Sequence, residues 1–192
     1  LVESEWVETA VASTIDLAFL SLCLDRQKSI SVNSYLFYDD FPNEPELPAY
    51  PRAQFRPTTM AEVEQLADFN TRNGEFEDSE AIEELFKTRL KYAQLLIEQQ
   101  QSFLLVDGDT ILGIGECRVS QSQPPFADIG MITDRDHRQR GVGTVGLAKL
   151  KQHCYQQNLQ PICSCDAANI ASRKTIEKAG FAARHRILDV VF

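Results

Sequence analysis

Positive charge is scarce in this sequence. Its 192 residues include 19 Lys and Arg against 28 Asp and Glu, which gives a net charge of −9. Because nucleic acids and anionic membranes bind cationic surfaces, we expect neither of them as a partner. The deficit is uneven, since residues 1–100 carry a net charge of −11 and residues 101–192 a net charge of +2. A small anionic ligand held by the second half remains compatible with this balance.

Long apolar runs and paired cysteines are also lacking. The most hydrophobic stretch, residues 9–24, is interrupted by Asp16 and is shorter than the ~20 apolar residues that a membrane span needs. Three glutamates precede it, where a signal peptide carries positive charge. The five cysteines are odd in number and irregularly spaced, unlike those of a secreted disulfide scaffold. These features favour a reduced, cytoplasmic location.

The overall composition, with 43% hydrophobic and 24% charged residues, is that of a globular protein with one sizeable core. Helical spacing of apolar residues predicts a helix over residues 5–25, whose stripe is interpreted as core or as a homodimer face. Alternation predicts a strand over residues 31–38. Four prolines within residues 39–52 exclude helix or central sheet there. We therefore expect an N-terminal helical and extended segment with a Pro-rich linker over residues 1–52, and a domain over residues 53–192.

The domain alternates strands and helices. Thr58 or Thr59 is the expected N-cap of a first helix, and Asp107-Gly108-Asp109 is the expected turn of a β-hairpin. Strands are predicted at residues 54–56, 102–106, 110–119, 127–133, 161–165 and 186–192. Helices are predicted from residue 58 or 59 to 69, from 78 or 79 to about 100, and at 142–157 and 170–179. The order predicts an α/β fold, a mixed sheet with helices on both faces.

The most informative segment is the loop from Asp134 to Thr144, between a predicted strand and a predicted helix. Gly141 and Gly143 remove side chains where a backbone approaches a ligand closely, and Arg138 and Arg140 add positive charge. A glycine-bearing loop before a helix N-terminus is typical of phosphate binding. Taken alone, the pattern is more typical of a tight turn with solvated arginines.

A second motif extends the pattern. Arg138-x-x-Gly141-x-Gly143 resembles the pyrophosphate loop of the GNAT superfamily of acyl-CoA N-acyltransferases. Asn169-Ile-Ala-Ser172, followed by a helix closed by Gly180-Phe181, is similar to the second signature of that family. The resemblance covers roughly residues 53–192 and implies a mixed, mostly antiparallel central sheet flanked by helices. Residues 128–134 and 165–169 further resemble the branch of zwittermicin-resistance acetyltransferases.

The resemblance implies how acetyl-CoA is held. Backbone amides after Arg138 would bind the pyrophosphate, the end of the strand at residues 127–133 would pair with the pantetheine arm, and one N–H of that strand would polarise the thioester carbonyl. Asn169 would bond the pantetheine, with Ser172 and Arg173 near the adenosine-phosphate or pantetheine side. The cofactor-binding residues assigned in this way are Met131, Ile132, Thr133, Arg138, Gln139, Arg140, Gly141, Val142, Gly143, Thr144, Asn169, Ser172 and Arg173.

An amine must be neutral to attack a thioester, so a general base is expected. Asp128 and Glu116, on neighbouring predicted strands, are the candidates, with Asp128 preferred; either could equally be a structural carboxylate. Many relatives carry a Tyr that protonates the leaving thiolate, and the corresponding residue here is Ile176. Tyr155, Cys165 or water would serve instead, or the thiolate would leave unassisted.

A zinc site is the main competing interpretation of the cysteines. His153, Cys154, Cys163 and Cys165 lie close in sequence, but Cys-x-Cys on one strand lacks the spacer of structural zinc sites. Buried thiols that pack the sheet are favoured, and no metal is expected.

These observations predict an N-acetyltransferase that moves an acetyl group from acetyl-CoA to a primary amine by direct transfer. The acidic first half weakly favours a cationic acceptor. A CoA-binding module without catalysis, a protein-interaction domain and a transferase for longer acyl groups stay open as alternatives.

Overall fold

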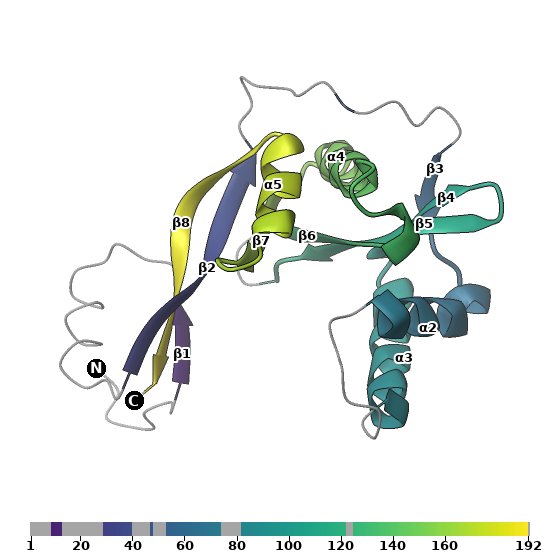
Figure 1. Ribbon diagram of the computed structural model, residues 1–192, viewed down its shortest axis with the longest axis horizontal. Helices are drawn as coiled ribbons and strands as arrows, with labels where there is room; N and C mark the ends of the chain where they lie inside the picture. Colours follow the sequence, from purple (N-terminus) through teal and green to yellow (C-terminus); the bar gives the residue numbers. More distant parts are fainter. Residues whose placement is uncertain are drawn as a thin grey trace.

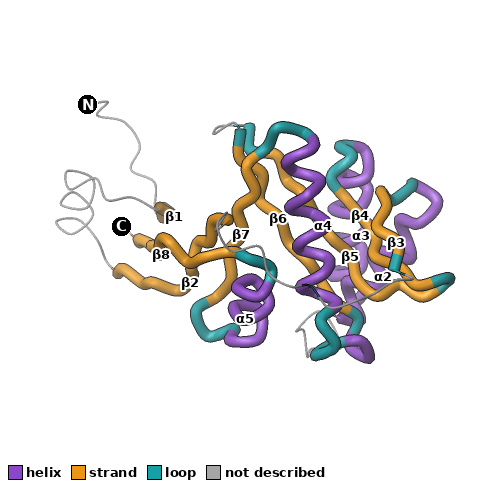
Figure 2. Tube along the Cα trace, turned by 90° about the horizontal axis from the view of Figure 1, so that it is seen from above, coloured by secondary structure: helices purple, strands orange, loops and turns teal. Residues whose placement is uncertain are grey.

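A single sheet organises the structure. The computed structural model describes residues 9–12, 29–39, 47, 53–73, 82–121 and 125–191. Eight strands lie in the order β1-β8-β2-β7-β6-β5-β4-β3, and only the β6–β7 pair is parallel (Figures 1 and 2). The predicted mixed, mostly antiparallel sheet is thus confirmed. The strands are β1 (Thr9–Ala12), β2 (Ser29–Asp39), β3 (Gln54–Pro57), β4 (Ser102–Asp107), β5 (Thr110–Val119), β6 (Phe126–Thr133), β7 (Gln160–Asp166) and β8 (Phe181–Val191).

Helices cover both faces of this sheet. They are α2 (Val63–Asn73), α3 (Ile82–Glu98), α4 (Val142–Gln156) and α5 (Ile170–Lys178), with short 3-10 turns η1 (Met60–Glu62) and η3 (Arg135–His137). α4 and α5 lie on one side of the strands, and α2 and α3 lie on the other (Figure 1). None of the described helices is long and apolar enough to cross a membrane.

Each face has its own apolar core. Leu147, Leu150 and Cys154 of α4 pack with Ile129 of β6 on one face. On the other face Leu66 and Phe69 of α2 and Ala93 and Ile97 of α3 pack with Leu104 and Ile114 of the hairpin strands. The alternation along the hairpin strands sends successive side chains into the two cores. This division lets the two faces carry different sites.

Local signals fix several element boundaries as the sequence predicted. Thr59 is the N-cap of η1, and Glu62 Oε2 accepts from its amide at 2.8 Å and its hydroxyl at 2.9 Å. Gly108 has a φ of 57° at the tip of the β4–β5 hairpin, which favours glycine. Asn169 caps α5, because its Oδ1 accepts from the Ser172 amide at 2.9 Å. The last strand begins at Phe181, five residues before its predicted start.

The N-terminal segment departs from the sequence-based expectation. The helix predicted over residues 5–25 is wrong at Thr9–Ala12, which form strand β1 beside the end of β8. The rest of that range lies outside the described residues. The strand predicted at 31–38 is confirmed as β2, and it inserts between β7 and β8 rather than standing apart. Its Phe37 is fully buried in the α4 core. The proposed division at residue 52 therefore separates stretches of sequence that share one sheet.

A buried polar cluster fastens β2 to α4. Lys151 Nζ donates to Asp39 Oδ1 at 2.9 Å, and the Tyr155 hydroxyl donates to Asp39 Oδ2. The side chains of Lys151 and Asp39 are only 11% and 7% exposed. Removing one partner of such a pair leaves the other charge buried without compensation, which is more costly than replacing the whole pair. Asp39 thus links the N-terminal strand to the helix that begins at the site described below.

We expect Asp39→Ala to lower the free energy of unfolding by about 3–5 kcal/mol, because Lys151 stays buried without its counter-ion. Glu177→Ala is the matched control, since it removes an exposed pair with Arg173 at 2.9 Å and should cost below about 0.5 kcal/mol. Urea unfolding of both variants checks the difference. Equal losses in the two variants would contradict this role of Asp39.

Candidate active site

The parallel strand pair opens into a cleft. β6 and β7 pair only from Phe126–Gln160 to Asp128–Ile162, after which β6 follows β5 and β7 follows β2. The gap between them is a cleft of about 1420 Å³, lined by the second half of β6, the start of α4, β7 and α5. Along this edge of β6, backbone N–H and C=O groups face the cleft instead of a strand. An extended ligand can therefore pair with β6 as an added strand.

The N-terminus of α4 faces this cleft, and no side chain caps it. Its N-cap is Gly141, with a φ of 84°, and Gln139 also adopts a left-handed φ of 61°. Backbone turns of this kind direct successive N–H groups to one side, as in anion-binding nests. Gly141 provides no side-chain cap for the first turn. The first-turn amides and the positive end of the helix dipole are thus available to an anion.

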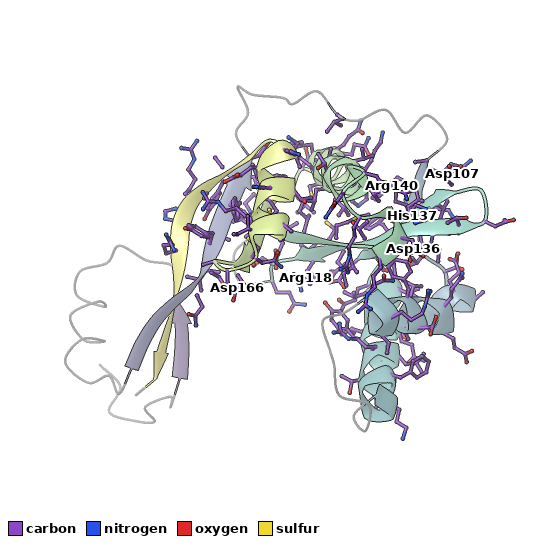
Figure 3. All side chains as sticks on the ribbon, viewed as in Figure 1. Asp107, Arg118, Asp136, His137, Arg140 and Asp166 are labelled. Atoms are coloured by element: carbon purple, nitrogen blue, oxygen red, sulfur yellow. The ribbon has the colours of Figure 1, made fainter. Side chains whose placement is uncertain are left out.

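Most of the predicted loop residues line the cleft. They are Arg138, Gln139, Gly141, Val142, Gly143 and Thr144. Arg140 is exposed beside α4 and does not line the cleft (Figure 3). Gly143 has little spare room, since a Cβ there would lie 3.0 Å from Thr175 Cγ2 and 3.1 Å from Thr133 Oγ1. A Cβ at this position would require these two threonine side chains to shift by a few tenths of an ångström.

Hydrogen bonds to α2 hold the loop in place. Arg138 Nη2 donates to the Asn73 carbonyl at 2.7 Å, and the Arg135 amide donates to Asn73 Oδ1 at 2.8 Å. Asp134 Oδ1 lies 3.0 Å from His137 Nδ1 and accepts from the Asp136 amide at 3.0 Å. Arg138, predicted as a phosphate contact, therefore also ties the loop to the C-terminus of α2.

The second signature forms the opposite wall of the cleft. Asn169 and Ser172 line it, and Asn169 Oδ1 caps α5. Arg173 does not line the cleft, because its guanidinium bonds Glu177 at 2.9 Å and lies over the Tyr35 ring. The cations that α5 presents to the cleft are Lys174 and Lys178, one helical turn apart.

A methionine seated between two glycines brings α4 close to β6. A Cβ on Gly146 of α4 would lie 2.2 Å from Met131 Sδ, and one on Gly113 of β5 would lie 2.4 Å from Met131 Cε. The Met131 side chain therefore fills the space that two missing side chains leave. Met131, Ile132 and Thr133 all line the cleft.

A smaller pocket of about 530 Å³ lies on the other face of the same strand segment. Its walls are Thr88, Arg89 and Tyr92 of α3, Ile114, Glu116 and Arg118 of β5, and Gly130, Met131 and Ile132 of β6. The three β6 residues line the large cleft as well. The strand is therefore a thin partition, with an open space above Gly130, where a Cβ would meet no atom within 4 Å.

The two candidate carboxylates belong to one hydrogen-bonded network beside this pocket. Arg118 Nη2 donates to Asp128 Oδ2 at 2.6 Å, and the Tyr92 hydroxyl donates to Glu116 Oε2 at 2.9 Å. Arg118 Nη1 lies 3.7 Å from Glu116 Oε2. Figure 3 shows Arg118 on the side of the strands opposite to α4. Glu116 lines the pocket and Asp128 does not.

Burial changes the acidity of two groups in this network. It raises the pKa of Asp128, and the nearby Arg118 guanidinium opposes that rise without cancelling it. Burial, followed by the charge of Glu116, raises the pKa of the Tyr92 phenol, so that Tyr92 stays a hydrogen-bond donor. The network thus keeps Glu116 hydrogen-bonded at the pocket wall.

The residue that the sequence resemblance aligns with a proton-donating tyrosine is an isoleucine in the wall of the cleft. Ile176, 4% exposed, occupies the wall there. Of the alternatives predicted from the sequence, Tyr155 donates its hydroxyl to Asp39, and neither Tyr155 nor Cys165 lines the cleft.

Comparison with known proteins agrees with this geometry. A family model described as the acetyltransferase (GNAT) family matches residues 62–181. The chain belongs to the GNAT acetyltransferase family. A second model, described as an acetyltransferase (GNAT) domain, matches residues 1–40, the range that contains β1 and β2. No curated protein sequence matches the chain.

Solved structures show the same GNAT fold. An acetyltransferase of the GNAT family from Colwellia psychrerythraea is 28% identical with a TM-score of 0.79, over 97% of this chain and 65% of that one. A GCN5-related N-acetyltransferase from Sphaerobacter thermophilus is 15% identical with a TM-score of 0.63, over 95% and 58%. The Salmonella typhimurium protein YncA, solved with its cofactor acetyl-CoA, is 11% identical with a TM-score of 0.53, over 73% and 92%. The chain thus spans less than two thirds of the first two structures.

Residues of the competing zinc interpretation are not brought together in this GNAT fold. Cys154 Sγ lies 3.4 Å from Cys117 Sγ, and His153 packs on the Phe103 ring at 4.5 Å. Cys163 lines the cleft, whereas Cys165 does not. Within the described residues, no group of three or more His, Cys, Asp or Glu side chains is arranged to hold a metal.

Several residues of the large cleft and of the smaller pocket were not predicted from the sequence. Lys174 and Lys178 carry a usable signal, because lysines at i and i+4 after a capped helix start share one face. Arg89 and Tyr92 carry none, since the pattern of an amphipathic helix does not show which of its polar side chains will face a pocket on the sheet. Asn73 is likewise a helix-end residue whose contact with the loop depends on the tertiary fold.

We expect Gly146→Ala and Met131→Ala to be coupled. Each change alone should lower the free energy of unfolding, the first by overpacking against Met131 and the second by leaving a cavity. In the double variant the alanine methyl enters the vacated space, so the combined loss should fall below the sum of the single losses. Chemical unfolding of the four proteins checks this, and strictly additive losses would contradict the contact.

Proposed function

We propose that this protein transfers an acetyl group from acetyl-CoA to a primary amine, by direct attack in a ternary complex. The observation that carries the proposal is the partition formed by β6. Gly130, Met131 and Ile132 line both the large cleft and the smaller pocket that contains Glu116. A thioester held in one cavity and an amine held in the other would meet at the open edge of this segment, which replaces a bimolecular encounter by positioned reactants.

The large cleft suits the donor. Its pyrophosphate would accept from the amides of the nest and of the first turn of α4, while Lys174 and Lys178 add positive charge. The pantetheine arm would pair with the open edge of β6, near Asn169. A β6 amide N–H would then donate to the thioester oxygen and stabilise the charge that develops there.

The smaller pocket suits the acceptor, and Glu116 is the base in this proposal. Glu116 lines the pocket, whereas Asp128 lies outside its wall and holds Arg118 at 2.6 Å. Glu116 would accept the ammonium proton, directly or through a water, and the neutral nitrogen would then attack the carbonyl carbon. As the C–N bond forms, the C–S bond breaks, and the nitrogen loses its second proton, which passes through water to the leaving thiolate. The products are the amide and the CoA thiol, and Glu116 returns the first proton to solvent. Asp128 acts here as a positioning residue for Arg118.

Two finer assignments belong to the same proposal. The segments that resemble the zwittermicin-resistance branch, residues 128–134 and 165–169, lie on β6 and at the end of β7, beside the cleft. The resemblance therefore concerns the site, and we retain that branch as the proposed relationship.

The four described cysteines are free thiols, which supports a reducing, cytoplasmic setting.

Donor binding is expected to depend on Gly141. Gly141→Ala puts a Cβ on a residue with a φ of 84°, which costs about 1–2 kcal/mol and distorts the nest, so acetyl-CoA affinity should fall at least tenfold. Gly108→Ala introduces similar backbone strain at the hairpin tip, with a φ of 57° and no atom near the new methyl group. It should lose comparable stability and keep the affinity of the unmodified chain. Calorimetric titration with acetyl-CoA separates the two variants, and a wild type without affinity would refute the proposed function.

We expect Glu116, rather than Asp128, to act as the general base. Glu116→Gln should lower kcat by roughly 10²–10⁴-fold with unchanged acetyl-CoA affinity, because the amide cannot accept the ammonium proton. Asp128→Asn keeps the shape of the partner of Arg118 and should lower kcat less than tenfold. Release of free CoA thiol with a panel of amines gives both values. The reverse order would transfer the role to Asp128, and thiol release by neither the wild type nor the variants would indicate a CoA-binding module without catalysis.

A further inference from the structure

Tyr92 contacts the proposed base from helix α3. It lines the smaller pocket together with Glu116, and its hydroxyl donates to Glu116 Oε2 at 2.9 Å. We infer that Tyr92 is a positioning residue for the acetyl transfer, which holds the Glu116 carboxylate in the orientation that accepts the proton of the amine. The inference rests on the proposed function, and in particular on Glu116 as the base.

The direction of the hydrogen bond from Tyr92 is fixed by Arg118. Arg118 Nη1 donates to the Tyr92 hydroxyl oxygen at 3.4 Å, and a guanidinium has no acceptor atom. The hydroxyl hydrogen of Tyr92 therefore points toward Glu116, whose ionised carboxylate can only accept. Arg118 is itself anchored, because its Nη2 donates to Asp128 Oδ2 at 2.6 Å. Tyr92 is thus held as a donor to Glu116.

These contacts distinguish the two carboxylate oxygens of Glu116. Within the described residues, the hydrogen bond from Tyr92 and the ion pair with Arg118 both involve Oε2. Oε1 is therefore the oxygen that would accept the ammonium proton. A glutamate side chain rotates about several single bonds, so contacts that fix it before the reaction reduce the entropy that must be lost to reach the transition state.

Open space for the amine lies beside this carboxylate. Glu116 of β5 is directly opposite Gly130 of β6, and the side chains of such a pair stand on the same face of a sheet, with Cβ atoms about 4.5–5.5 Å apart. Gly130 has no side chain, and a Cβ there would meet no atom within 4 Å. An amine over Gly130 would therefore lie between the Glu116 carboxylate and the open edge of β6. Tyr92 keeps the carboxylate next to this space.

Tyr92→Phe tests the inference, because it keeps the ring and removes the hydroxyl. Thiol release from acetyl-CoA is measured with ethanolamine, phenethylamine, cadaverine and lysine, and kcat is referred to the fraction of protein that binds acetyl-CoA in a calorimetric titration. For the amine that the wild type uses best, kcat should fall at least tenfold, while the KM of that amine and the affinity for acetyl-CoA change less than threefold. A change in packing alone would alter the affinities or the folded fraction instead.

A double-mutant cycle separates positioning from other effects of the substitution. In the Glu116→Gln background, Tyr92→Phe should lower kcat less than threefold, because no base is left to be positioned. Tyr155→Phe is the matched control, since it also removes a hydroxyl that donates to a carboxylate, that of Asp39, and it lines neither cavity. The kcat of this control should stay within threefold of the wild-type value.

The outcomes distinguish this inference from the function on which it rests. An unchanged kcat in Tyr92→Phe, or the same fold loss with and without Glu116, overturns the positioning role while Glu116 remains the base. A loss in Tyr155→Phe equal to that in Tyr92→Phe overturns it as well. Full kcat in Glu116→Gln removes the base assignment and the inference with it. A wild type that binds no acetyl-CoA, or that releases thiol with none of the four amines, refutes the proposed function and the inference together.

Discussion

The divergence of β6 from β7 is the constraint on which the site depends. Two parallel strands that pair over three residues and then separate leave one edge of β6 open in the middle of an otherwise continuous sheet. Beyond this point each strand keeps its partner on the other side, β5 for β6 and β2 for β7. The N-terminus of α4 lies at the mouth of this gap, and Met131 between Gly113 and Gly146 fixes its distance from β6. Backbone groups of the sheet and of the helix therefore converge on one cleft.

The same strand segment connects the two halves of the proposed chemistry. Because side chains alternate along β6, Met131 packs toward α4 while Gly130 opens toward α3. A donor on one face and an acceptor on the other both reach the open edge of β6, where the reacting atoms could come into contact. The N-terminal strand β2 supports this arrangement from outside, since it covers the free side of β7 and is fastened to α4 by Asp39 and Lys151.

The sequence predicted most of the fold because its signals were local. The Asp-Gly turn, the Thr59 cap and the Gly141 loop each depend on a few neighbouring residues, and the two glycine-bearing signatures lie where they were expected. The helix predicted around Thr9–Ala12 failed for the opposite reason. Its apolar residues repeat at a helical period, but pairing with the end of β8, almost 180 residues away, makes them a strand. The position of β2 inside the sheet depends on equally distant partners.

The acceptor pocket was the least predictable part of the site. Glu116 was identified as a candidate from its strand, but Tyr92 and Arg89 reach the pocket only through the packing of α3 on the sheet. Overall charge was a weak guide for the same reason. The acidic first half of the chain contributes Arg89 to the pocket, and the second half contributes both Glu116 and Arg118. The charge balance at a site is set by the few side chains that the tertiary structure brings to it.

Amide hydrogen exchange with and without acetyl-CoA tests the central claim most directly, because the account assigns donor binding to backbone N–H groups. It predicts that acetyl-CoA slows exchange at residues 129–133 on the open edge of β6 and at residues 139–145 around the start of α4, with little change in α3. Protection that is absent from both segments, or confined to α2 and α3, would contradict it.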